Sequence, residues 1–268
     1  MRSEEYLYQY HERYGYTSIV NPKSSKLNII EFGILRLGSK EKYQDKAKNS
    51  ELVLVVLSGI CKVESDGEIL NPVGYRKDVF SGLPYAVYIP QNTTYTVTGE
   101  RDVEIAVCKG EVHSPQSTIH SPQLITPNQV KCRTVGRENF KREVRDIVGE
   151  DFPARVLLVG ETLSPPGNWS SFPPHKHDEN NLPQEACLEE LYYFKVTPKQ
   201  GFGIQGIYTS TKKVDNTFYV HDSSVVIIPE GYHPVVAAPG YSLYYLWVLA
   251  GNTRFLKFSE DPVHSWIK

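Results

Sequence analysis

The sequence has few cysteines, no long apolar run and no excess of positive charge. Its four cysteines are Cys61, Cys108, Cys132 and Cys187, and no two of them form a CxxC pair. This scatter excludes a zinc knuckle and gives no support to a disulfide framework. The longest apolar stretch, near residues 243–250, is far shorter than the roughly 20 residues that cross a membrane. With 29 Lys and Arg against 31 Asp and Glu, the formal charge is −2, so nucleic acid is not an expected partner.

The N-terminal residues 1–6 are polar and charged, and they lack the apolar stretch of a signal peptide. Unpaired cysteines in a chain without such a signal are typical of a reducing compartment. We therefore expect a cytoplasmic protein with reduced thiols and no membrane partner.

The length and the residue types favour two all-β domains. At about 100–150 residues per domain, 268 residues correspond to roughly two. A hydrophobic fraction of 40% and a charged fraction of 22% exclude wholesale disorder. The 18 Tyr and 10 Phe, together with 19 Gly and 18 Pro, suit strands and turns better than long helices.

Short apolar or alternating runs recur along the chain, and Gly, Pro and Asn residues separate them. They lie at residues 26–37, 51–64, 85–90, 103–112, 155–163, 191–196, 202–208, 224–229 and 241–250. Many short strands joined by turns predict a sandwich or barrel. In segment 138–149, however, Phe140, Val144 and Ile147 fall at helical spacing, so this segment is expected to be either a short helix or a strand.

The middle of the chain has the composition of a linker. Residues 111–130 are rich in Ser, Pro, Gln and Thr. Each half also contains a strand that ends in an Ile-Pro corner, at 89–90 and at 228–229. We therefore predict two similar β domains, at residues 1–125 and 126–268.

A cluster of histidines and carboxylates in the second half predicts a metal site. On a strand, His175 and His177 point to the same face because side chains alternate. Glu189 and Glu190 offer carboxylates at the head of an apolar strand, and His233 follows a Pro-Glu-Gly turn. An isolated HxH is common on exposed loops, but the coincidence of all three features favours metal binding. Three imidazoles and one carboxylate suit zinc, manganese, iron or nickel.

The first half contains no HxH motif. The remaining histidines have no comparable surroundings and are expected to lie at the surface or in ordinary hydrogen bonds. They are His11, His113, His120, His221 and His264.

The order of these motifs resembles the metal motifs of the cupin β-barrel, with two departures. Twelve residues, 178–189, separate His177 from Glu190, and Tyr232 alone separates the glycine and histidine of the second motif. With these departures, segment 167–178 is similar to the 5-deoxy-glucuronate isomerases of myo-inositol catabolism. Similar segments occur along nearly the whole chain, at 74–80, 88–90, 181–183, 189–193, 229–234, 240–246 and 261–267.

The resemblance implies a bicupin related to the uronate isomerases of pectin breakdown. In that family the metal lies in the C-terminal barrel, so the implied ligands are His175, His177, Glu190 and His233. Glu190 is preferred to Glu189 because the family's ligand immediately precedes a Leu-Tyr-Tyr strand. The implied cofactor is one divalent metal ion, with zinc the first expectation, and the N-terminal barrel is expected to be metal-free.

The implied reaction converts 5-deoxy-glucuronate to 5-dehydro-2-deoxy-gluconate, an aldose–ketose isomerisation. A metal acting as a Lewis acid would stabilise the enediol, and a base must move a proton between adjacent carbons. Tyr245, Lys176, Glu189 and a metal-bound water are all candidates for the base. The substrate carboxylate requires a cation, for which Arg254 is the candidate.

Other functions fit the same motifs. They are a related uronate isomerase acting on 5-dehydro-4-deoxy-glucuronate, a cupin iron dioxygenase, and a sugar-binding bicupin without turnover. No helix-turn-helix segment is evident, which weakens a regulatory version of the last. The expected partner is a small sugar acid, and a homo-oligomer remains open.

Overall fold

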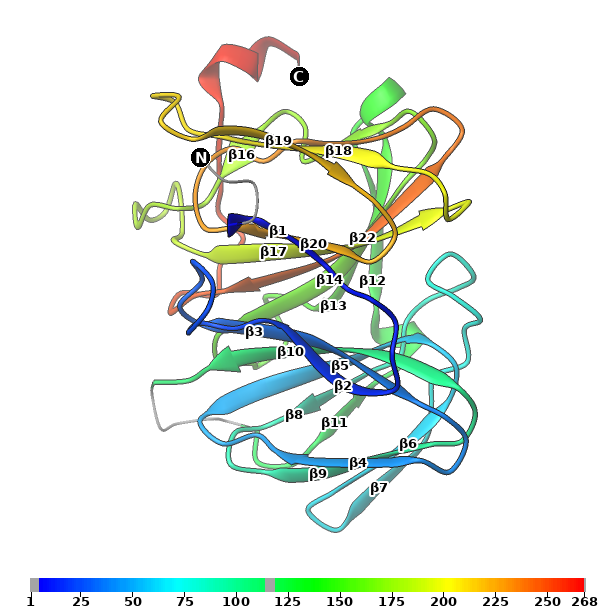
Figure 1. Ribbon diagram of the computed structural model, residues 1–268. Helices are drawn as coiled ribbons and strands as arrows, with labels where there is room; N and C mark the ends of the chain where they lie inside the picture. The colour runs from blue at the N-terminus through cyan, green and yellow to red at the C-terminus, as the bar shows by residue number, and fades with distance from the viewer. Residues whose placement is uncertain (1–4, 114–118, 268) are drawn as a thin grey trace.

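The computed structural model describes residues 5–113 and 119–267, which form two stacked, antiparallel β-barrels (Figure 1). This confirms the all-β, bicupin expectation. Part of the predicted linker, residues 114–118, lies outside the described residues. Among those described, no helix is long and apolar enough to cross a membrane.

The first barrel consists of a six-stranded and a four-stranded sheet. The order is β11-β8-β5-β10-β3-β2 in the larger sheet and β4-β9-β6-β7 in the smaller. The strands are β2 (Gly15–Val20), β3 (Ile30–Leu37), β4 (Lys42–Lys46), β5 (Ser50–Ser58), β6 (Cys61–Ser65), β7 (Glu68–Val73), β8 (Ala86–Ile89), β9 (Thr94–Gly99), β10 (Val103–Glu111) and β11 (Gln123–Ile125).

The second barrel has a seven-stranded sheet in the order β1-β20-β17-β22-β14-β13-β12, faced by a four-stranded sheet, β15-β21-β18-β19, with a short pair β16-β23. The strands are β1 (Leu7–Gln9), β12 (Lys131–Val135), β13 (Arg142–Val148), β14 (Leu157–Ser164), β15 (Trp169–Ser170), β16 (His175–Lys176), β17 (Glu189–Thr197), β18 (Gly203–Tyr208), β19 (Asp215–Val220), β20 (Ser224–Ile228), β21 (Val235–Ala237), β22 (Ser242–Ala250) and β23 (Ser259–Glu260). Short 3-10 turns are η2 (Pro127–Gln129), η3 (Glu138–Phe140) and η4 (Pro262–Ile267).

The segment left open between helix and strand is a 3-10 turn followed by a strand. Residues Glu138–Phe140 form η3, and Arg142–Val148 form β13 between β12 and β14. Phe140 lies in the turn, whereas Val144 and Ile147 both lie in β13, whose pairing with β14 shifts register between Asp146 and Val148. The three-residue spacing of Val144 and Ile147 therefore coincides with an irregularity in the strand.

The two large sheets have matching strand orders, in which β5 corresponds to β17, β10 to β22 and β8 to β20. Their edge strands also correspond, because β11 pairs with β8 and β1 pairs with β20. Strand β1 comes from the start of the chain and completes the sheet of the second barrel. The division into domains at residue 125 remains a prediction, and this N-terminal strand ties the two barrels together.

Two carboxylates reinforce the junction between the barrels reciprocally. Glu51, at the head of β5, accepts the backbone N–H groups of residues 155–157 at 2.8 Å and the Tyr88 hydroxyl at 2.7 Å. Glu189, at the head of β17, accepts the N–H groups of residues 28–30 at 2.6–2.7 Å. Charge-assisted bonds of this kind satisfy backbone donors where the two large sheets meet.

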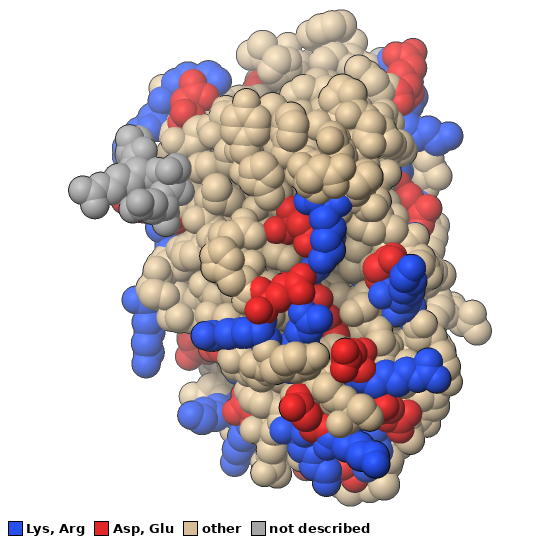
Figure 2. Space-filling view, turned by 45° about the vertical axis from the view of Figure 1, so that its right-hand side comes forward, with Lys and Arg blue, Asp and Glu red and all other residues tan. Residues whose placement is uncertain are grey.

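Charged side chains of both signs are interspersed over the face shown in Figure 2. Acidic and basic groups lie next to one another there without a continuous basic area. This face therefore offers no broad surface for a polyanion.

Candidate metal centre and substrate cavity

A cavity of about 550 Å³ opens inside the second barrel. Its walls come from β12, β13, β14, β17 and β22, and from segments 170–177 and 256–260, which include the short pair β16-β23. This volume is typical of sites for small molecules. The described part of the cavity wall combines aromatic and aliphatic side chains with a few polar groups.

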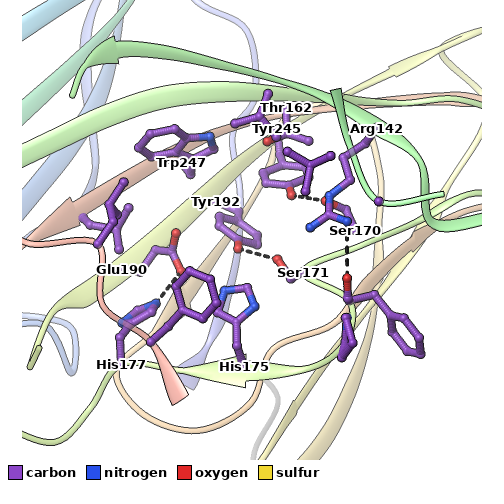
Figure 3. A pocket seen from close by; sticks show the side chains of 18 of the residues that line it. Arg142, Thr162, Ser170, Ser171, His175, His177, Glu190, Tyr192, Tyr245 and Trp247 are labelled. Carbon is purple, nitrogen blue, oxygen red and sulfur yellow. Dashed lines mark hydrogen bonds and ion pairs between the residues drawn. The ribbon is translucent and has the colours of Figure 1, made fainter. Parts of the chain in front are cut away.

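His177, Glu190 and His233 form a buried group that could hold a metal ion, since their ligand atoms all lie within 4.8 Å of one another. His177 and Glu190 line the cavity, and His233 is fully buried beside them. The Glu190 Oε2 atom is 3.1 Å from His177 Nε2 (Figure 3). It is 3.3 Å from His233 Nε2. The three residues are far apart in sequence and are brought together by the loop after β16, the head of β17 and the turn after β20.

Backbone carbonyls orient both imidazoles for metal binding. The Nδ1 atom of His177 lies 2.7 Å from the Leu188 carbonyl, and that of His233 lies 3.0 Å from the Gly231 carbonyl. A carbonyl only accepts, so each Nδ1 carries a proton, and each imidazole in its neutral form presents a lone pair at Nε2. The His233 Nε2 atom is buried and has no hydrogen-bond partner among the described residues. The donor set therefore fits a metal ion.

Burial controls the charge of these imidazoles. It lowers the pKa of His233 to about 3, and the neighbouring His175 lowers it further in the same direction. Burial also disfavours the charged form of His177, but the hydrogen bond to Glu190, the negative charge of Glu190 and the Leu188 carbonyl together outweigh it and raise the pKa of His177. A neutral imidazole is the form that binds metal, so His233 is ready to coordinate at physiological pH.

His175 lines the cavity beside this group. Its ring centroid lies 4.7 Å from that of His233 and 6.3 Å from that of His177. Burial lowers the pKa of His175 to about 3, with His177 and Arg142 contributing in the same direction. The four sequence-predicted ligands therefore lie close together, three of them on the cavity wall, with His175 outside the closest group of three.

Lys176 and Glu189, two of the candidate bases, point away from the cavity. The Lys176 Nζ atom lies 2.6 Å from Asp178 and 3.0 Å from the buried Glu185. Glu189 holds backbone N–H groups of the first barrel, as described above. Both positions follow from the alternation of side chains along β16 and β17, which places their neighbours His175 and Glu190 at the cavity instead.

Tyr245, the third candidate side chain, lies in the cavity wall. Its hydroxyl hydrogen-bonds to Ser170 Oγ, and its ring centroid is 4.3 Å from that of Tyr192 (Figure 3). The Tyr192 hydroxyl in turn lies 2.9 Å from Ser171 Oγ. Two phenols held by serines thus stand next to the buried His–Glu group.

The structure does not bring Arg254 to the cavity. Its guanidinium donates to four backbone carbonyls, those of Gly149, Phe152, Ala154 and Leu157, at 2.6–3.0 Å. Arg254 therefore fastens the loop before β14. The cavity wall contains a different arginine, Arg142 of β13, which the sequence analysis did not single out. Had residues 138–149 been assigned as a strand, alternation would have placed Arg142 and Val144 on its inner face.

The five remaining histidines lie outside the cavity wall, in agreement with the expectation for them. Four are exposed and His264 is partly exposed, 4.0 Å from Asp261.

The fold and this site define a bicupin with a candidate metal centre in its second barrel. Oxalate decarboxylase from Lactobacillus farciminis shares the fold, with a TM-score of 0.67 at 12% identity, covering 95% of this chain and 88% of that one. The model of the KduI/IolB family matches residues 6–267, so the chain belongs to that family.

Relatives within the family are much more similar. The 5-deoxy-glucuronate isomerase of Geobacillus kaustophilus is 42% identical over 249 residues, covering 92% of this chain and 89% of the relative. That of Bacillus subtilis strain 168 is 39% identical over 250 residues, covering 92% and 91%. The crystal structure of an IolB-like protein from Salmonella typhimurium LT2 superposes with a TM-score of 0.93 at 32% identity, covering 98% of each chain.

Proposed function

We propose that this chain is a metal-dependent aldose–ketose isomerase that converts 5-deoxy-glucuronate to 5-dehydro-2-deoxy-gluconate in inositol catabolism. The observation that carries the proposal is the buried group of His177, Glu190 and His233, of which His177 and Glu190 line a sugar-sized cavity. It occurs in a chain that is about 40% identical, over 92% of its length, to enzymes named for this reaction. The unpaired cysteines support a cytoplasmic location for the enzyme.

The metal ligands would be His177, Glu190, His233 and, from the adjoining wall, His175. This set of three imidazoles and one carboxylate suits a divalent ion such as zinc, and also manganese, iron or nickel. When bound, the metal would supply Lewis-acid polarisation of the substrate's carbonyl and hydroxyl oxygens.

The side chains around the metal site would hold the substrate and move its proton. Of the three candidate side chains, Tyr245 lies in the cavity wall, with Ser170 within hydrogen-bond reach of its hydroxyl. We assign proton transfer at the Tyr245 hydroxyl, with Ser170 orienting it. Trp247 and Leu249, on the same face of β22, exclude water from the cavity.

The test is an assay of the purified protein with 5-deoxy-glucuronate, before and after treatment with a chelator. We expect a ketose product, loss of turnover on chelation, and recovery when a divalent metal is added back. Parallel reactions contain 5-dehydro-4-deoxy-glucuronate, and an oxygen electrode monitors both. Faster turnover of that uronate would favour the related isomerase, and oxygen uptake would identify a dioxygenase.

A further inference from the structure

Arg142 stands on the cavity wall in a fixed position. Its Nη1 atom donates to the carbonyls of Phe140 and Phe172, at 3.1 Å and 3.3 Å. These two bonds hold the guanidinium plane, while the Nε atom is buried without a hydrogen-bond partner among the described residues. The side chain is therefore oriented, and its hydrogen-bonding capacity is incompletely used.

The positive charge of Arg142 also has no negative partner among the described residues. No ion pair joins it to an acidic side chain anywhere in residues 5–113 or 119–267. Burial lowers its pKa, and Arg133 acts in the same direction, whereas Tyr192 and Tyr245 oppose the shift. An arginine stays protonated under such conditions, so a half-buried positive charge faces the cavity. An unpaired charge of this kind is costly until an anion approaches it.

The other basic side chains near the site are already engaged or exposed. Arg254 donates to four backbone carbonyls, and Lys176 is paired with three carboxylates. Arg133 at the edge of the cavity pairs with Asp146, and Lys257 is exposed to solvent. Arg142 is therefore the cation in the described cavity wall that is best placed to receive an anionic group.

Figure 3 shows Arg142 across the cavity from His177 and Glu190, with Tyr192 and Tyr245 between them. The cavity is thus bipolar, with a metal-binding group on one side and a guanidinium on the other. We infer that Arg142 binds the carboxylate of a sugar-acid substrate, whose carbonyl end then lies at the His–Glu group. The position of the substrate carbonyl at the His–Glu group rests on the proposed function. The position of the carboxylate is argued from the contacts of Arg142 alone.

This orientation would make Arg142 a specificity-determining residue. A sugar whose carboxylate is replaced by an alcohol would meet the same metal group but would leave the guanidinium unpaired. The enzyme would therefore discriminate against neutral sugars through the cost of that unpaired charge.

The test compares Arg142→Gln with Arg142→Lys and with the matched control Arg137→Gln, which removes an exposed guanidinium outside the cavity wall. The substrates are 5-deoxy-glucuronate and 5-deoxy-glucose, which lacks the carboxylate. We expect Arg142→Gln to raise KM for the acid about 10-fold or more, with unchanged metal content. It should change kcat/KM for the neutral sugar by less than about 2-fold. Arg142→Lys should restore part of the affinity, and Arg137→Gln should match the parent for both sugars.

A binding experiment separates this inference from the proposed reaction. Calorimetry with D-glucuronate measures the carboxylate subsite whether or not the protein turns over any sugar. A Kd about 10-fold weaker in Arg142→Gln than in Arg137→Gln supports the subsite even if 5-deoxy-glucuronate is not isomerised. Equal Kd values in the two variants, or equal losses for acid and neutral sugar, would overturn it.

Discussion

The two barrels share a strand arrangement but differ in the side chains that point into them. Glu51 and Glu189 occupy equivalent places at the heads of β5 and β17, where each binds backbone N–H groups of the opposite barrel. The next residue along each strand therefore points into its own barrel, and it is Leu52 in the first and Glu190 in the second. Leu52 belongs to a buried apolar cluster with Leu54 and Val56.

The turns after the corresponding strands β8 and β20 show the same contrast. Asn92 and Gly231 both adopt the left-handed backbone conformation, with φ of +63° and +89°. Two residues further on, the first barrel has Thr94 where the second has His233. Residues 38–49, which join β3 to β5, contain no histidine, whereas the corresponding connection in the second barrel carries the HxH motif. A few side chains at equivalent backbone positions thus distinguish the first barrel, which has an apolar core, from the second, which has a candidate metal centre.

The strongest test of this difference replaces Glu190 by leucine, the residue that the first barrel has at the equivalent position, Leu52. We expect Glu190→Leu to lower metal affinity by about 100-fold or more, because the carboxylate and its charge are both removed. Isomerase activity should fall with it, while the all-β circular dichroism spectrum persists. Metal analysis should find about one ion per parent chain and none per variant chain. Two ions per parent chain, or one retained in Glu190→Leu, would place a site outside the group described here.

A second comparison uses adjacent positions of the HxH motif. His177→Ala should reduce metal content after dialysis by about 10-fold or more, since it removes a buried ligand. Lys176→Ala should keep the metal, because its side chain points away from the cavity. Its effect should instead be on stability, since Asp178, Glu179 and the buried Glu185 lose their shared cation. Similar metal loss in both variants would show that alternation does not govern this segment.

The proton-transfer assignment predicts a loss of turnover that leaves the metal in place. Tyr245→Phe keeps the ring beside Tyr192 and removes the hydroxyl that contacts Ser170. We expect kcat to fall about 100-fold with little change in KM or metal content, as for loss of a general acid or base. Ser171→Ala, which removes the corresponding partner of Tyr192, is the control and should reduce kcat far less. An unchanged kcat in Tyr245→Phe would move the proton transfer to another group.

Sequence alone predicted what depends on local pattern. Alternating apolar runs and turn residues gave the β architecture and the two barrels, and motif order led to His177, Glu190 and His233, which the structure brings together. The family resemblance that rested on those motifs is confirmed by the match over residues 6–267.

Contacts between residues far apart in the sequence could not be predicted from the sequence pattern. Glu189 contacts residues 28–30, which lie about 160 positions away in the other barrel. Arg254 is held by carbonyls of residues 149–157, on a loop whose course depends on tertiary packing. Arg142 was missed for a local reason, because the spacing of Val144 and Ile147 across a register shift in β13 imitates a helical period.

The smallest effect is expected for Glu51 and Glu189, the two carboxylates at the junction between the barrels. Glu51→Gln and Glu189→Gln keep the shape of the side chain and remove its charge, so each weakens three hydrogen bonds to backbone N–H groups of the opposite barrel. We expect each to lower the free energy of unfolding by about 1–3 kcal/mol, with metal content unchanged. Glu51 is 1% exposed and also accepts the Tyr88 hydroxyl, so its variant should be the less stable of the two. Urea unfolding followed by fluorescence measures the difference. If Glu189→Gln instead empties the metal site while Glu190→Gln does not, the carboxylate that faces the cavity is Glu189. Glu51 and Glu189 would then not be equivalent.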